Sequence, residues 1–173
     1  MKWIVCENLR SAYNVGNIFR TADALGRGVI CSGYTARADH PQVKKTSLGA
    51  EESVPYHSFE TIEETMTWMR SQSDALILAA EITEKSLSLT DAHVLQTIKI
   101  SIESESDIFL IVGNEITGVE EYTLLQSDLI IHIPMQWHKE SLNVGQAAAI
   151  CMRTIDLQRP YFVIRRVSDC QLL

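Results

Sequence analysis

Residues 133–149 read Ile-Pro-Met-Gln-Trp-His-Lys-Glu-Ser-Leu-Asn-Val-Gly-Gln-Ala-Ala-Ala. The segment begins as the end of an apolar strand, breaks at Pro134, and restarts after a polar turn as a helix from Ser141. Small residues at Gly145 and at 147–149 let another backbone or a bound ligand approach closely. A strand end of this kind is where an α/β protein holds a ligand, so we expect a binding site here.

The rest of the chain sets the class of protein. Its 173 residues are 46% hydrophobic, which is enough for a core, and we predict a single domain over 1–173. It has no run of about 18 apolar residues, and residues 1–7 lack the layout of a signal peptide. The four cysteines form no CxxC pair, which indicates reduced thiols, no metal site and a cytoplasmic protein.

Charge is unevenly distributed. The net charge is −7, but residues 1–50 hold seven basic and three acidic residues, a net of +4. An acidic body with a basic N-terminal third is compatible with a local phosphate-binding face, and equally with ordinary surface variation.

Strand-like and helical runs alternate along the chain. This alternation predicts an α/β domain with a mostly parallel sheet and helices on both faces. We expect strands at 3–6, 28–34, 54–59, 74–80, 108–112 and 129–133. We expect helices at 12–25, 61–71, 91–97 and 141–157, and a polar, basic loop at 35–50.

Two further segments carry polar residues suited to a site. In the first, Asn14 is placed to cap a helix or precede it, and Arg20 lies on an otherwise apolar face. Arg20 is either an anion-binding side chain or an arginine that extends from a core helix to the surface.

In the second segment, Gly113 and Gly118 flank Glu115 at the end of a buried strand. A tight turn explains the glycines, and Glu115 either stabilises the next helix or serves the site.

Several enzyme classes are excluded by their motifs. The chain has no phosphate-binding G-x-x-x-x-G-K-[ST] loop, no dinucleotide-binding G-x-G-x-x-G and no G-x-S-x-G nucleophile elbow. His132 and His138 are not spaced as metal ligands, and His132 reads as a core residue. A cofactor would therefore lie in a backbone cradle at three strand ends, near Ala80, at Gly113 and at 133–135.

Four blocks, in this order, resemble the SPOUT class of methyltransferases, specifically the TrmH (SpoU) family of RNA ribose 2′-O-methyltransferases. They are Asn-Val-Gly-x-x-x-Arg-Thr-Ala from 14, Lys-Thr-Ser-x-Gly-Ala from 45, Ile-Val-Gly-Asn-Glu-x-x-Gly-Val from 111, and Ile-Pro-Met followed by Ser-Leu-Asn-Val. The resemblance implies a C-terminal deep trefoil knot that holds S-adenosylmethionine (SAM), and a homodimer. It implies no metal.

The resemblance also assigns residues. Cofactor-binding positions carry over to Ala80, Gly113, Ile133, Met135, Ser141 and Leu142. Arg20 matches the catalytic arginine and would act on the pocket of the partner chain, and the other matched site residues are Asn14, Glu115, Ser141 and Asn143. Trp137 departs from the pattern, because the family usually has glycine there.

The chain resembles the minimal members of the family, which lack a separate N-terminal RNA-binding domain. RNA binding would then fall to the basic N-terminal third, with Arg10, Arg37, Lys44 and Lys45 as candidates, or these side chains belong to a solvated loop. We expect the protein to methylate a ribose 2′-hydroxyl of RNA, and of tRNA rather than rRNA. The alternative is a non-catalytic RNA-binding or assembly protein that kept the fold, for which Trp137 and the acidic body are the support.

Overall fold

A computed structural model describes residues 1–72, 74–136 and 141–158. The strands are β1 (Lys2–Glu7), β2 (Gly28–Ser32), β3 (Tyr56–Phe59), β4 (Leu76–Ala80), β5 (Leu87–Ser88), β6 (Ile108–Val112) and β7 (Leu129–His132). The helices are α1 (Ala12–Leu25), α2 (Pro41–Ser47), α3 (Ala50–Ser53), α4 (Ile62–Arg70), α5 (Ala92–Glu103), α6 (Glu121–Gln126) and α7 (Val144–Leu157).

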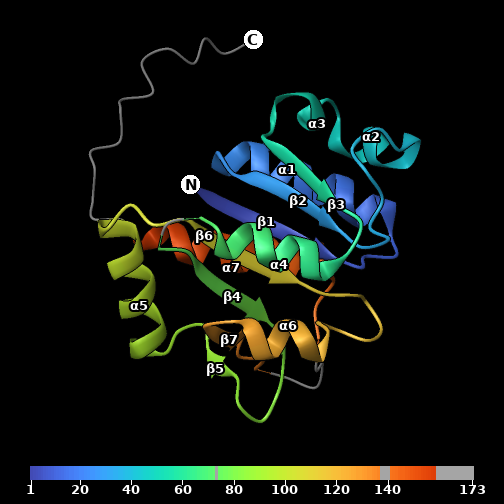
Figure 1. The fold of residues 1–173 in the computed structure, drawn as a ribbon. Coiled ribbons are helices and arrows are strands. Elements are labelled where there is room, and N and C mark those ends of the chain that lie inside the picture. Colours follow the sequence, from blue (N-terminus) through green and yellow to red (C-terminus); the bar gives the residue numbers. More distant parts are fainter. Residues whose placement is uncertain (73, 137–140, 159–173) are drawn as a thin grey trace.

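The described strands form one sheet in the order β3-β2-β1-β6-β4-β7-β5, and every neighbouring pair is parallel (Figure 1). All strands therefore end at one edge of the sheet, which we call the carboxyl edge. The segments that follow β1, β2, β4, β6 and β7 meet there, and this is the edge at which parallel sheets bind ligands.

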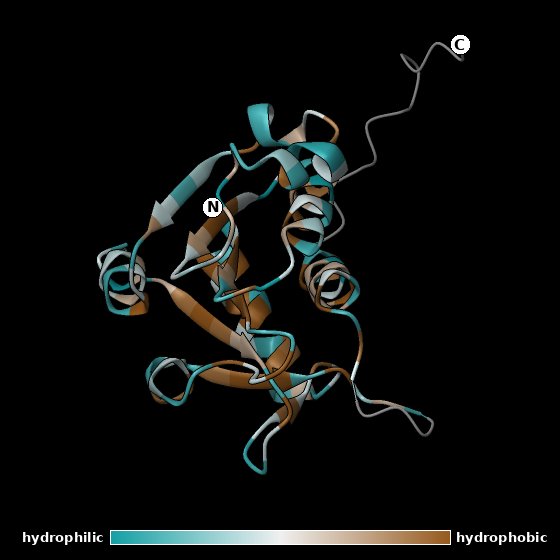
Figure 2. Ribbon diagram, turned by 90° about the vertical axis from the view of Figure 1, so that its right-hand side faces the viewer, coloured by the Kyte–Doolittle hydropathy of each residue, from teal (hydrophilic) through white to brown (hydrophobic). Residues whose placement is uncertain are grey.

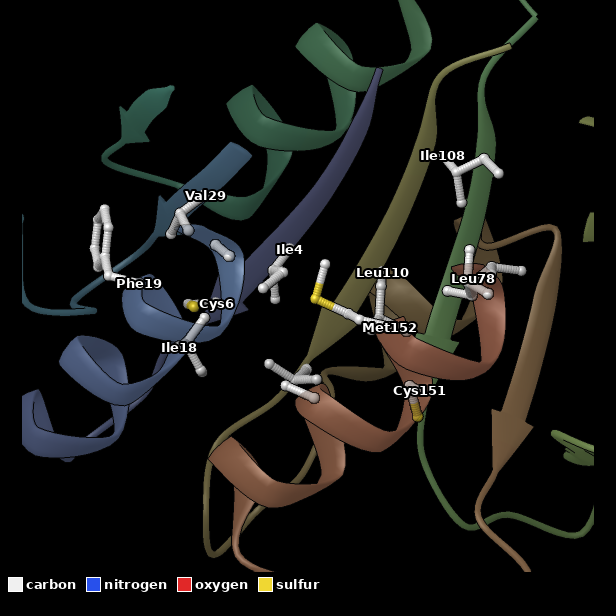
Figure 3. Close-up of a cluster of buried hydrophobic side chains, with 14 of the residues drawn as sticks. Ile4, Cys6, Ile18, Phe19, Val29, Leu78, Ile108, Leu110, Cys151 and Met152 are labelled. Atoms are coloured by element: carbon white, nitrogen blue, oxygen red, sulfur yellow. The ribbon is translucent and has the colours of Figure 1, made fainter. Parts of the chain in front are cut away.

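Helices cover both faces of the sheet, as predicted (Figure 2). Side chains alternate along β1, so that Ile4 and Cys6 join the core under α1, α5 and α7, while Trp3 and Val5 join the core under α4. Figure 3 shows the first core, where α1 and α7 bring their apolar side chains against the central strands. The continuous apolar runs of the central strands follow from this two-sided burial.

Helix α1 has the predicted bounds. The hydroxyl of Ser11 caps it by accepting a hydrogen bond from the backbone N–H of Asn14, and Gly26 ends it in the left-handed conformation with a φ of 62°. Asn14 thus lies inside the first turn, and the expectation that it caps the helix or precedes it is wrong.

The prediction of a loop over residues 35–50 is wrong, because α2 occupies much of it. His40 caps α2 by accepting a hydrogen bond from the N–H of Gln42, and Pro41 suits the first helical turn. The helix packs on α1 at Gly16, where a Cβ would lie 2.5 Å from the carbonyl oxygen of Val43. Seven residues are too few for a helical period to stand out in the sequence, so the tertiary contact decides.

Other boundaries also differ from the predictions. The last helix begins at Val144 rather than at 141, because Asn143 caps it by accepting a hydrogen bond from the N–H of Gly145 at 3.0 Å. Helix α5 continues to Glu103, beyond the predicted 97. Strands β2, β3, β4 and β7 are each one or two residues shorter than expected. No helix in the described ranges is long and apolar enough to cross a membrane.

Glu7 is a carboxyl group enclosed in the fold at the end of β1. It is fully buried, and its Oε1 accepts a hydrogen bond of 2.7 Å from the backbone N–H of Glu120. The buried hydroxyl of Thr123 also interacts with this carboxyl group, and this contact acts to lower the pKa of Glu7. Burial raises the pKa of Glu7 from 4.5 to about 7, against the lowering effect of the bond from Glu120.

We expect Glu7→Gln to change how stability depends on pH. Between pH about 5 and 7 the folded wild type keeps the proton of Glu7 while the unfolded chain has lost it, so stability falls as pH rises through this window and is level above it. The glutamine variant lacks this loss and is expected to be about 2 to 3 kcal/mol more stable at pH 8. Urea unfolding at pH 5, 6, 7 and 8 measures this; parallel curves for the two proteins would contradict it.

Candidate active site

A pocket of about 390 Å³ opens at the carboxyl edge between the ends of β4, β6 and β7 and the start of α7. All six predicted cofactor positions line it, although they come from distant parts of the sequence: Ala80, Gly113, Ile133, Met135, Ser141 and Leu142. The volume lies within the range of small-molecule sites. The lining combines apolar side chains with strand-end backbone, as the cradle interpretation requires.

The wall after β6 is a tight loop over residues 113–119. The backbone of Asn114 pairs with that of Gly118 by hydrogen bonds of 3.0 and 2.9 Å. A Cβ on Gly113 would lie 2.3 Å from the backbone nitrogen of Val119, so this position requires glycine. Gly118 has a φ of 72°, and a Cβ there would lie 2.1 Å from Oε2 of Glu81. Both glycines are therefore explained by the turn.

Glu81 is a pocket residue that the sequence analysis missed. Its carboxylate accepts hydrogen bonds from the N–H of Ile82 at 2.8 Å and of Val119 at 2.9 Å, and so ties the end of β4 to the 113–119 loop. It places a negative charge in the lining of the pocket. The only sequence signal was its position as the first residue after a buried strand.

Glu115, Asn14 and Asn143 form one hydrogen-bonded chain across three elements. Glu115 accepts bonds from the N–H of Arg10 at 2.9 Å, the N–H of Ser11 at 3.1 Å and the Nδ2 of Asn14 at 2.8 Å. Asn14 in turn accepts a bond from the Nδ2 of Asn143 at 3.1 Å. The predicted site residues from 14, 115 and 143 are thus brought together at the mouth of the pocket.

The protonation states at this site follow from these contacts. Burial raises the pKa of Glu115, but the hydrogen bonds from Arg10, Asn14 and Ser11 outweigh it, so its net pKa lies below its ordinary value. Glu115 is therefore a carboxylate at neutral pH, beside the start of α1 where a negative charge is favourable. Cys151 also lines the pocket, but burial raises its pKa to about 12, so its thiol stays protonated.

Arg20 does not line this pocket. It is exposed on α1 and borders a shallow surface hollow with Asn17, Thr21, Ala149 and Arg153, which belong to α1 and α7. The structure therefore leaves Arg20 apart from Asn14, Glu115, Ser141 and Asn143 within one chain.

The predicted RNA-binding side chains fall into two groups. Arg10, Lys44 and Lys45 are exposed. Arg37 donates hydrogen bonds of 2.8 Å to the backbone carbonyls of Cys31 and Phe59, so its guanidinium fastens the end of β2 to that of β3. Arg27 is buried and paired with Asp156, which reduces the basic surface below the formal +4.

Three expectations concern other groups. His132 is half-buried rather than in the core, and its Nδ1 lies 2.9 Å from the hydroxyl of Ser86. Within the described residues no cluster of three or more His, Cys, Asp or Glu side chains is arranged to hold a metal. Trp137, His138 and Cys170 lie outside the described residues.

Comparison with known proteins decides the family. The model of the SpoU rRNA Methylase family matches residues 1–153. The chain belongs to this family. The resemblance inferred from the four sequence blocks is confirmed. Solved SpoU methyltransferases share the fold of this domain. The trefoil knot stays a prediction.

One relative is the 23S rRNA (guanosine-2′-O-)-methyltransferase RlmB of Coxiella burnetii, which is 27% identical over 157 residues. That match covers 90% of this SpoU-family chain and 58% of RlmB. The chain spans between 55% and 58% of the length of this RlmB and of those from Ralstonia nicotianae and Bordetella pertussis.

Two solved structures show the same fold. An rRNA methyltransferase from Sinorhizobium meliloti with bound AdoMet has a TM-score of 0.79 and 21% identity, and the match covers 92% of this chain and 57% of that one. A structure described as giving insights into the 2-OH methylation of C/U34 on tRNA has a TM-score of 0.76 and 21% identity, and the match covers 91% and 95%.

Proposed function

We propose that this protein transfers a methyl group from SAM to a ribose 2′-hydroxyl of RNA. The observation that carries the proposal is that one pocket is lined by all six predicted cofactor positions, which are Ala80, Gly113, Ile133, Met135, Ser141 and Leu142. The hydrogen-bonded chain Glu115–Asn14–Asn143 lies at its mouth. Membership of the SpoU family supports the same activity.

The residues of the pocket fit SAM. Apolar side chains such as Ile133, Met135 and Leu142 suit the adenine ring, and strand-end backbone offers hydrogen bonds to its edge. Glu81 places a carboxylate in a pocket that would hold a cationic sulfonium. When bound, SAM supplies an electrophilic methyl group, so the protein has to bring a ribose oxygen to it in line.

The chain's own residues have positioning roles. A ribose hydroxyl is a weak nucleophile, so alignment supplies much of the rate. Asn14 and Asn143 offer neutral hydrogen-bonding groups, and Glu115 holds Asn14 in place. Arg20 would bind the phosphate beside the target ribose and stabilise negative charge that develops on the attacking oxygen. A guanidinium holds its proton too tightly to serve as a general base, and we give Arg20 no such role.

Arg20 leads us to propose a homodimer. Its hollow lies where α1 and α7 meet the surface, and Ile150 nearby on α7 is 41% exposed. A partner seated on these helices would bring Arg20 of each chain toward the pocket of the other. The dimer is thus part of the catalytic proposal, because one chain does not place Arg20 at its own pocket.

We propose RNA as the substrate because only RNA has the 2′-hydroxyl. Within RNA we favour tRNA over rRNA. Support comes from the solved structure concerned with C/U34 of tRNA, which shares this fold with a TM-score of 0.76, while RlmB of Coxiella burnetii, which is 27% identical, is an rRNA enzyme and stands for the competing choice. We also propose a cytoplasmic location, where a bacterial enzyme of this kind meets its RNA.

Calorimetry separates the enzyme from the rival, a non-catalytic RNA-binding or assembly protein of the same fold. We expect SAM titrated into the purified protein to bind with one site per chain, because the pocket has room and suitable residues. Guanosine triphosphate serves as a control that should not bind, since the chain has no phosphate loop. No heat at millimolar SAM would favour the rival.

A further inference from the structure

Tyr34 presents an exposed aromatic ring in the turn after β2, at the carboxyl edge. Its exposure is 64%, although a tyrosine ring gains free energy from burial. Neighbouring positions of this turn are enclosed: Ser32 and Thr35 are buried. An isolated exposed ring is ordinary on a protein surface, so the contacts of Tyr34 have to decide whether it is a site.

Hydrogen bonds hold Tyr34 both at its backbone and at its hydroxyl group. The backbone N–H of Tyr34 donates to Oδ1 of Asn8 at 3.2 Å. The phenol oxygen accepts a hydrogen bond of 2.6 Å from Nδ2 of Asn114, a residue that is only 7% exposed. A tyrosine anchored in this way loses little conformational freedom when a ligand packs on its faces.

The backbone around Tyr34 is built to hold this position. Gly33 has a φ of 65°, and a Cβ there would lie 1.9 Å from Oδ1 of Asn8, so only glycine leaves room for the Asn8 contact. Asn8 itself has a φ of 50°, a conformation that asparagine tolerates better than most residues. The hydroxyl of Thr35 accepts from the N–H of Leu9 and donates to the carbonyl of Cys6, which fixes the two segments side by side.

Tyr34 is also next to the proposed active site. Asn114, which holds its hydroxyl, lines the pocket, and the following residue is Glu115. Arg10, whose N–H bonds to Glu115, is exposed two residues after Asn8. The ring therefore lies at the same edge as the pocket, and the segment that contacts it through Asn8 also carries the exposed Arg10, whose guanidinium suits a phosphate.

We propose that Tyr34 is a stacking platform for an unpaired nucleobase of the RNA substrate. This inference rests on the proposed function. A ribose whose 2′-oxygen enters the pocket belongs to a nucleotide that has left its helical stack, and aromatic side chains replace the lost stacking. Because every base has a π face, the platform binds bases without selecting their sequence.

Two variants separate stacking from the hydrogen bond to Asn114. Tyr34→Leu is expected to raise the KM for RNA by about tenfold to a hundredfold, the loss that removal of one stacked base predicts. Tyr34→Phe keeps the ring and should stay within about threefold of the wild type. The KM for SAM should not change in either variant. Tyr122→Leu on α6, which removes another exposed tyrosine, is the matched control.

A binding assay tests the platform without turnover. The probe is a single-stranded RNA 12-mer of uridines with one central 2-aminopurine, whose fluorescence falls when it stacks. We expect quenching by the wild type and Tyr34→Phe and none by Tyr34→Leu. Equal quenching by the wild type and Tyr34→Leu, no quenching by the wild type, or an unchanged KM for RNA in Tyr34→Leu overturns the inference. Failure of the wild type to methylate any RNA counts against the proposed function instead, while the quenching still decides the platform.

Discussion

Arg20→Ala is expected to lower the turnover of methyl transfer by about a hundredfold to a thousandfold, the effect of removing one charge-stabilising donor from a transition state. SAM binding should stay close to that of the wild type, because the proposed contacts of Arg20 are with the RNA phosphate and the attacking oxygen and not with the cofactor, and because Arg20 does not line the pocket of its own chain. Tritiated methyl transfer measures the turnover and calorimetry measures the binding. Turnover retained in the variant would remove Arg20 from the mechanism.

Arg153→Ala is the matched control, since Arg153 borders the same hollow as Arg20 and carries the same charge. We expect a much smaller loss, within about threefold, because the proposal gives Arg153 no contact with the reacting groups. An equal loss in both variants would indicate that the hollow needs positive charge in general, and not the side chain of Arg20.

Mixed dimers test whether Arg20 acts across the interface. Chains carrying Arg20→Ala and chains carrying Gly113→Ala are each expected to have little activity alone when SAM is limiting. If Arg20 serves the partner's pocket, refolding them together restores about a quarter of the wild-type rate, because about half of the dimers are mixed and each has one complete site. No recovery, with mixed dimers demonstrated by mass, would contradict the proposed arrangement.

Gly113→Ala is expected to weaken SAM binding by more than about tenfold and to destabilise the fold by about 1 to 3 kcal/mol, the usual cost of overpacking. The new Cβ would meet the backbone of Gly118 and Val119 at 2.3 to 2.4 Å, and backbone has no easy way to yield. The shift would carry Val119 away from Glu81 and deform one wall of the pocket. Calorimetry with SAM and urea unfolding measure the two effects.

Gly26→Ala separates a loss of stability from a loss of binding. Gly26 ends α1 with a φ of 62°, and a Cβ there would meet nothing within 4 Å. Alanine in the left-handed conformation costs about 1 to 2 kcal/mol, so this variant should be destabilised similarly but bind SAM normally. Normal SAM binding by Gly113→Ala would show that the 113–119 loop is not a wall of the cofactor site.

Much of the fold was predictable because its signals are local. The strand at 108–112 and the helix at 12–25 have the predicted bounds, since the strand is an uninterrupted apolar run and the helix has apolar spacing up to Gly26. Helix α2 was missed because a segment of this length, packed at Gly16, is too short to show the helical repeat of apolar residues in its sequence. The start of α7 was placed three residues early because Ser141 and Asn143 are both good caps, and only the contacts of Asn143 choose between them.

Some residues of the candidate site were predictable from the sequence and others were not. Glycines and motif residues predicted the pocket lining from the sequence, and all six predicted cofactor positions line one pocket in the structure. Glu81, Asn114 and Tyr34 were missed because their roles depend on neighbours distant in sequence, such as Glu81 with Val119 and Tyr34 with Asn8. Arg37 has a structural role that the sequence did not show, because its guanidinium donates hydrogen bonds to two backbone carbonyls; RNA binding by Arg37 stays a prediction.

The most direct test of the central claim is methyl transfer itself. Total RNA from a strain of the source organism that lacks this gene would be incubated with the purified protein and tritiated SAM, fractionated into tRNA and rRNA, and mapped for 2′-O-methyl groups. We predict that one RNA gains a 2′-O-methyl group at a defined nucleotide, that the same group is missing in the deletion strain, and that the RNA is a tRNA. Absence of incorporation into any RNA by protein that binds SAM, or methylation of a base instead of a ribose, would contradict the account.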